Sequence, residues 1–193
     1  MILKKLFFAC FITIISLQVQ AQTNHIKEKI VPPSEGKTVI YFVRTTGLGS
    51  LINFRYFDGE KYLGKFNGRS YLRYECEPGE HIFWLKAENV DVLKADLKEG
   101  KTYLVLTNAA MGAFSAAAKF RVIDLKSEKQ LKRIDWVFEK RKEATFTEEE
   151  LKKGAEKNRF IIKKSQKKIS KKLKKKKKHS VLEPDMYLEL ESL

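Results

Sequence analysis

The residues of this sequence best suited to acid–base or metal chemistry are its three histidines. His25 and His179 lie in polar segments near the two ends of the chain, so only His81 lies in strand-like sequence. A general base needs a positioned partner and a metal site needs several ligands, and neither pattern surrounds His81. We therefore expect no catalytic residue, no metal site and no cofactor. His81 opens a strand after a turn, where packing or turn hydrogen bonding is its expected role; a hydrolase that uses His81 is kept as an alternative.

Two further features that invite a chemical interpretation have simpler structural ones. The stretch TTGLGS, residues 45–50, is glycine-rich and follows a strand-like run, but it lacks the lysine and the following helix of a phosphate-binding loop. We interpret it as a loop with unusual backbone angles. Cys76 alternates with Leu72 and Tyr74 on one side of a strand pattern, which indicates a small buried hydrophobe.

The charge of the chain is concentrated in one segment. Residues 152–178 hold fifteen lysines and arginines and one acid, Glu156, so this segment carries +14 of the chain's net +15. The first five residues add +2, which leaves the rest of the chain close to neutral. The whole-chain charge is therefore no evidence for a protein that is basic throughout.

A local block of lysines favours binding to an anionic surface through long-range electrostatic attraction. The expected partner is an anionic envelope surface (lipid, lipopolysaccharide or polysaccharide) or an acidic protein. A solvated helix face without a partner and a nucleic-acid-binding tail are the alternatives, the second disfavoured in the cell because the chain looks exported. The residues expected to carry the contact are Lys163, Lys164, Lys167, Lys168, Lys171, Lys172, Lys174, Lys175, Lys176, Lys177 and Lys178.

The N-terminus has the pattern of a secretory signal. A short basic start is followed by the apolar run 6–17, which is shorter than the roughly 20 residues that a membrane-spanning helix needs. Small residues then precede a cleavage position between Ala21 and Gln22. The sequence thus predicts export to the periplasm or cell envelope, peripheral to a membrane; an uncleaved anchor is the alternative.

The middle of the chain has the pattern of an all-β domain. Turn signals such as Asp58-Gly59 and Asn67-Gly68 recur at hairpin spacing between short β-branched and aromatic runs. This pattern predicts an antiparallel β-sandwich. The stretch 108–120, rich in alanine, is expected to be a packed crossover or an exposed loop. The strand-like runs are residues 38–44, 51–57, 60–66, 70–76, 81–87, 91–97, 101–108 and 119–125.

Two helices are expected after the strands. Ser127 and Gln130 form a Ser-x-x-Gln capping-box pattern, and Thr147 and Glu150 form a second one. The second helix is long, basic and amphipathic, with lysines on its other faces. Its apolar stripe consists of Leu151, Ala155, Ile162, Ile169 and Leu173.

Several motifs in this order resemble the bacterial domain-of-unknown-function family 2846, whose exported β-sandwich domains are similar to PEGA domains. The motifs are IYFVR at 40–44, the Gly-Ser loop 47–50, Asp-Gly-Glu at 58–60, PGEH at 78–81 and EGKTY at 99–103. The resemblance covers about half the chain. It implies an immunoglobulin- or PEGA-like sandwich and an envelope location, and it implies no reaction.

Together these patterns predict a non-enzymatic exported envelope protein, in which a β-sandwich binding or scaffold module precedes a basic helix. The expected organisation is a signal peptide at 1–21, a linker at 22–37, the β-sandwich domain at 38–126, a short helical extension at 127–145, the basic amphipathic helix at 146–178 and a tail at 179–193.

Overall fold

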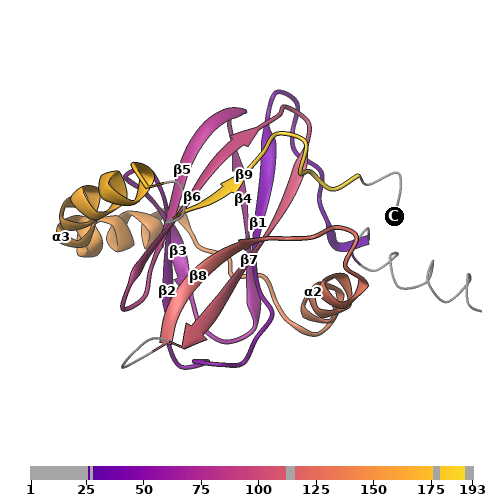
Figure 1. Cartoon of the computed structure of the whole chain (residues 1–193), viewed down its shortest axis with the longest axis horizontal. Helices are drawn as coiled ribbons and strands as arrows, with labels where there is room; N and C mark the ends of the chain where they lie inside the picture. The colour runs from indigo at the N-terminus through magenta and orange to yellow at the C-terminus, as the bar shows by residue number, and fades with distance from the viewer. Residues whose placement is uncertain (1–25, 27, 112–115, 176–178, 190–193) are drawn as a thin grey trace, which may run out of the picture.

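Two β-sheets packed face to face form the centre of the molecule, and one helix covers the outer face of each (Figure 1). The structure is a computed structural model that describes residue 26 and residues 28–111, 116–175 and 179–189. Sheet A has the strand order β4-β1-β7-β8, and sheet B has the order β3-β2-β5-β6-β9. The described elements are β1 (Thr38–Arg44), β2 (Phe54–Asp58), β3 (Lys61–Phe66), β4 (Ser70–Cys76), β5 (Gly79–Lys86), β6 (Val90–Leu97), β7 (Thr102–Met111), β8 (Ala116–Val122), α2 (Glu128–Lys140), α3 (Glu148–Leu173) and β9 (Ser180–Leu182).

The mostly-β fold with two C-terminal helices confirms the coarse prediction, but the sheets are not purely antiparallel. Strand β1 pairs with β7 in parallel, and β9 pairs with β6 in parallel. Both pairs join strands that lie far apart in the sequence, so no short hairpin forces the two strands to run in opposite directions. The expectation of an antiparallel sandwich is therefore corrected to two mixed sheets.

The predicted turns form where expected, but one joins neighbouring strands of a sheet and the other joins the two sheets. Asp58 and Lys61 face each other across a tight β2–β3 hairpin, in which Gly59 adopts a φ of 53°. The Asn67-Gly68 turn also has a left-handed glycine, yet it connects β3 of sheet B to β4 of sheet A. The alanine-rich stretch is likewise not a crossover, because its ends pair as the β7–β8 hairpin, with Ala109 opposite Ala118.

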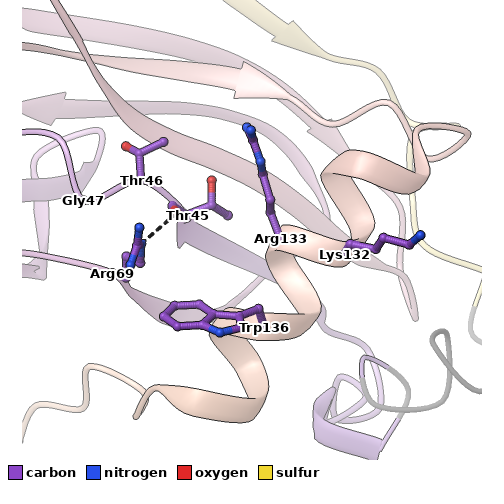
Figure 2. A pocket seen from close by; sticks show the side chains of 7 residues that line it. All are labelled: Thr45, Thr46, Gly47, Arg69, Lys132, Arg133 and Trp136. Atoms are coloured by element: carbon purple, nitrogen blue, oxygen red, sulfur yellow. Dashed lines mark hydrogen bonds between the residues drawn. The ribbon is translucent and has the colours of Figure 1, made fainter.

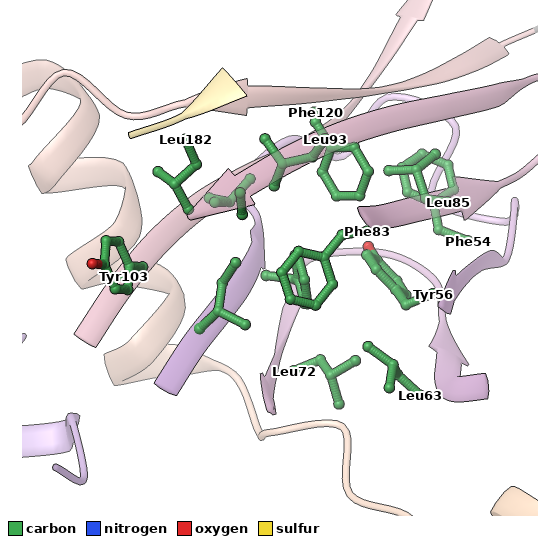
Figure 3. Packing of buried hydrophobic residues seen from close by; sticks show 14 of the residues in the cluster. Phe54, Tyr56, Leu63, Leu72, Phe83, Leu85, Leu93, Tyr103, Phe120 and Leu182 are labelled. Carbon is green, nitrogen blue, oxygen red and sulfur yellow. The ribbon is translucent and has the colours of Figure 1, made fainter. Parts of the chain in front are cut away.

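The main core lies between the two sheets and is rich in aromatic side chains (Figure 3). Phe42 from sheet A contacts the rings of Tyr56 and Phe83 from sheet B, with ring centroids 5.5 and 5.4 Å apart. The Tyr56 hydroxyl, which is fully buried, is 2.8 Å from Thr107 Oγ1. Cys76 is buried in the same cluster, as its strand pattern predicted.

Helix α2 packs on the outer face of sheet A through Ile134, Val137 and Phe138. The predicted capping box at its start does not form. Ser127 is the N-cap residue but makes no side-chain capping bond, and the Gln130 side chain instead accepts a hydrogen bond from Asp124 N at 3.3 Å. The helix begins at the expected residue because its apolar face is buried, not because its cap is strong.

The segment after α3 returns to the sandwich. Strand β9 extends sheet B, and Leu182 is fully buried in the core between the sheets (Figure 3). Farther on, Leu188 N donates to Thr102 O at 2.8 Å, and the Leu188 side chain joins the cluster beneath α2. Ile26, ahead of the strands, is buried in that same cluster. Residues near both ends of the described chain thus stabilise the fold.

Candidate functional site: the exposed face of helix α3

Helix α3 lies against the outer face of sheet B, on the opposite side of the molecule from α2 (Figure 1). All five residues of the expected apolar stripe belong to its interface with the sheet. They meet Phe57, Trp84 and Val92 of sheet B, and the Phe57 and Trp84 rings stack with centroids 3.8 Å apart. This docking fixes which side of the helix faces solvent.

The start of α3 is specified by its local sequence. Thr147 Oγ1 accepts a hydrogen bond from Glu150 N at 3.2 Å, and Glu150 Oε2 accepts one from Thr147 N at 2.8 Å. This reciprocal pair is the predicted capping box. Glu148, Glu149 and Glu150 occupy the first turn, where the helix dipole stabilises negative charge.

Gly154 allows α3 to approach the sheet closely. A Cβ atom at this position would lie 2.2 Å from Cε1 of Tyr62, a separation that no real contact has. Tyr62 itself is buried, with 6% of its surface exposed. Glycine weakens a helix interior by about 1 kcal/mol relative to alanine, so its presence here is explained by packing and not by helix propensity.

Most of the lysines expected to bind an anionic surface lie on the solvent side of α3 or just beyond its end. The helix places them there because the apolar stripe occupies the opposite side. Lys176, Lys177 and Lys178 lie outside the described residues. The exposed members of the expected set are Lys163, Lys164, Lys167, Lys168, Lys171, Lys174 and Lys175.

Lys172 differs from the other lysines. Its Nζ lies 3.1 Å from Asp91 Oδ1, and its side chain is 28% exposed. Asp91 is a buried residue of β6 whose other carboxylate oxygen accepts a hydrogen bond from Phe120 N at 2.9 Å. Lys172 therefore neutralises a buried carboxylate between the two sheets, and its charge is already engaged.

One large aromatic side chain lies among the exposed lysines of α3. Phe160 is 74% exposed, and Lys164 Nζ lies 5.8 Å from the centroid of its ring. Burial, followed by the nearby charges of Lys168 and Arg55, lowers the pKa of Lys86 in the neighbouring sheet. The face thus combines unbalanced positive charge with one large apolar group.

His81, the other candidate from the sequence, is held on both sides. Its Nδ1 is 2.8 Å from Asp58 Oδ2 and its Nε2 is 2.9 Å from Glu77 O. Its ring stacks on Phe83. Hydrogen bonding to Asp58, then to Cys76, raises the pKa of His81 to about 10. These contacts are the packing and turn hydrogen bonding expected of His81. That His81 is not a catalytic base stays a prediction.

A second cationic site, which was not predicted from the sequence, is a pocket between the loop after β1, Arg69 and Arg133. Its residues come from three separate segments, so no short motif contains them. Within the described residues, no group of three or more His, Cys, Asp or Glu side chains is arranged to hold a metal ion.

Comparison with models of known protein families and with curated proteins found no match. The resemblance to domain-of-unknown-function family 2846 therefore stays a prediction from motifs. No helix among the described residues combines the length and the hydropathy needed to cross a membrane. The proposed signal peptide and its cleavage position between Ala21 and Gln22 lie outside the described residues.

Proposed function

We propose that this protein is a non-enzymatic exported envelope protein that binds an anionic surface through the exposed lysines of α3. The observation that carries the proposal is the segregation of charge on a docked helix. The apolar stripe from Leu151 to Leu173 packs against sheet B. The exposed lysines lie together on the side that faces solvent, and Glu156 is the one acid from residue 152 to 175. In this proposal α3 is a basic amphipathic helix whose apolar side faces its own domain.

Electrostatic attraction of this kind has a useful magnitude. A lysine near an anionic membrane contributes about 1 kcal/mol at low ionic strength, so a few of the exposed lysines suffice for reversible attachment. Because these charges are solvated, the attraction weakens as salt screens it. Binding should therefore be strong in dilute buffer and released by salt.

Phe160 favours a lipid surface over the other anionic surfaces. An exposed aromatic ring among lysines can enter the boundary between headgroups and acyl chains, while the lysines remain at the phosphates. A polysaccharide or an acidic protein offers the lysines the same attraction but no apolar layer for the ring. The sandwich would then serve as the binding or scaffold module carried by this anchor. The motifs that resemble family 2846 support an immunoglobulin- or PEGA-like domain of the envelope.

Sedimentation with lipid vesicles tests the proposal. Wild type should sediment with vesicles containing phosphatidylglycerol, should not sediment with pure phosphatidylcholine, and should be released by salt. Replacing Lys163, Lys164, Lys167 and Lys168 with glutamine should remove up to about 4 kcal/mol of binding at low salt, close to a thousandfold.

A matched variant distinguishes binding through the face of α3 from an effect of the net charge of the protein. Glutamine at four exposed lysines elsewhere changes the net charge equally and should weaken binding by less than tenfold. The four control positions are Lys98, Lys119, Lys126 and Lys142. Equal losses in the two variants would refute a dedicated face on α3, and preferential binding of nucleic acid over anionic vesicles would favour the alternative function.

A further inference from the structure

A second cationic site lies on the other side of the molecule from α3. A pocket of about 390 Å³ opens between the loop after β1, the start of β4 and helix α2 (Figure 2). None of the described residues that line it is acidic. They are Thr45, Thr46, Gly47, Arg69, Lys132, Arg133 and Trp136.

One wall of the pocket is a loop held in place by a buried arginine. The Arg44 guanidinium donates hydrogen bonds to Ile52 O at 2.9 Å, Leu48 O at 3.1 Å and Gly49 O at 2.5 Å. It also lies 4.0 Å above the ring of Phe54. Three backbone carbonyls bonded to one buried side chain fix the path of the loop, so this wall is formed before any ligand arrives.

Two arginines from different parts of the chain line the pocket. Arg69 Nε donates to Thr45 O at 3.2 Å, and its guanidinium carbon lies 5.0 Å from the centre of the Trp136 ring. Arg133 extends from α2 toward the loop, whereas Lys132 points away from it (Figure 2) and lies 3.7 Å from Glu128. Arg69 is therefore oriented by its neighbours, with guanidinium N–H groups beyond Nε left for a ligand.

The pocket also contains a hydroxyl that has no partner. Thr46 Oγ1 is buried and makes no hydrogen bond within the described residues. An unsatisfied buried hydroxyl costs free energy that a hydrogen-bonded one does not. The loop that forms this wall therefore keeps one unsatisfied polar group.

We propose that this pocket binds a phosphate dianion, either inorganic phosphate or the phosphate group of a small ester. The guanidinium group matches the geometry of phosphate oxygens and donates several charge-assisted hydrogen bonds at once. Two arginines, with no acid in the lining, match a group of two negative charges better than a singly charged carboxylate. This site shares no residue with the α3 face and is independent of the function proposed above.

The test uses the two indole N–H signals in the NMR spectrum of the ¹⁵N-labelled protein. Trp136 lines the pocket, whereas Trp84 is buried beneath α3 and donates to Gly59 O, so it serves as an internal control. Inorganic phosphate, phenyl phosphate and acetate are titrated at constant ionic strength and pH 7.5. The Trp136 signal should shift saturably with both phosphates, and acetate should bind at least roughly tenfold more weakly. Tighter binding of phenyl phosphate than of inorganic phosphate would identify an ester as the ligand.

Arg133→Gln should weaken phosphate binding roughly tenfold or more, because it removes a charge-assisted donor. The matched control is Lys129→Gln, which removes the same charge from an exposed position of α2 outside the pocket lining and should leave affinity unchanged within about twofold. Both positions are exposed, so both variants should fold with unchanged spectra elsewhere. No saturable shift of Trp136, equal binding of acetate, or full affinity in Arg133→Gln would overturn the proposal.

Discussion

Replacing Gly154 with alanine should destabilise the protein, although the same change would stabilise an isolated helix. Helix propensity alone favours alanine by about 1 kcal/mol. The new Cβ, however, would lie 2.2 and 2.7 Å from Cε1 and Cδ1 of Tyr62. That ring packs against Phe57, which stacks on Trp84, so displacing it would disturb the packing between α3 and sheet B. Overpacking of this kind costs about 3 kcal/mol at the upper end, which leaves a net loss of about 2 kcal/mol.

Urea unfolding followed by tryptophan fluorescence, to which Trp84 beneath α3 contributes, measures the loss directly. Ser170→Ala, at an exposed position of the same helix, is the control and should be neutral or stabilising by a few tenths of a kcal/mol. Tyr62→Leu should remove the clash, so that adding Gly154→Ala to it costs little. If Gly154→Ala alone stabilises the protein by about 1 kcal/mol, then α3 does not pack closely on Tyr62 and the argument for a fixed outer face fails.

Three further predictions concern the rest of the molecule. The pKa of His81 is raised from 6.5 to about 10 on folding, so its stabilising effect should be complete below pH 6.5 and lost as the pH rises to about 10. The slope, up to about 1.4 kcal/mol per pH unit, should flatten in His81→Gln, and identical pH profiles for both proteins would contradict the imidazolium assignment. Leu182→Ala should cost about 2–4 kcal/mol in urea unfolding, whereas Val181→Ala on the same short strand should cost under about 1 kcal/mol; equal costs would place Leu182 outside the core. Sequencing of the protein purified from cells should begin at Gln22, and an intact Met1 would rule out cleavage.

The strands and the start of α3 could be predicted because their signals are local. Tyr71, Leu72 and Cys76 lie in a run whose predicted bounds match β4, and the Thr147–Glu150 capping box needs only four consecutive residues. Such features depend on neighbours in the chain, which a sequence displays directly.

The sheet order and the C-terminal strand were not predictable in the same way. The parallel pairing of β1 with β7 joins residues more than sixty positions apart, and no turn signal encodes it. Strand β9 is only three residues long, and its place beside β6 depends on Leu182 filling a gap in a core built by other strands. The Ser127–Gln130 pattern is the converse case, because this local signal predicted a capping box that does not form in the fold.

The candidate sites also combine features that the sequence displays with features that only the fold reveals. The lysines of α3 were visible in the sequence, but the pairing of Lys172 with Asp91 spans 81 residues and could be seen only in the fold. Likewise, the loop TTGLGS lacks the lysine of a phosphate-binding motif, yet the fold brings Arg69 and Arg133 beside it. Charges that are scattered along the chain become a site only when the topology gathers them.

The role of the C-terminal segment also determines how attachment through α3 should be tested. Removing the chain after Thr147 would delete α3 together with β9 and Leu182, so the truncated protein would lose part of its core. Substitutions in the full chain avoid this loss, because the lysines to be replaced are exposed and lie outside the apolar cluster between α3 and sheet B.

Attachment through α3 is therefore best tested by fractionation of cells that produce one of three proteins. These are the full-length protein, the variant with glutamine at Lys163, Lys164, Lys167 and Lys168, and the matched variant with glutamine at four lysines outside α3. We expect wild type and the matched variant to sediment with envelope membranes and to be released by salt, while the α3 variant stays in the supernatant. If all three proteins fractionate alike, the exposed face of α3 does not hold this protein at an anionic surface.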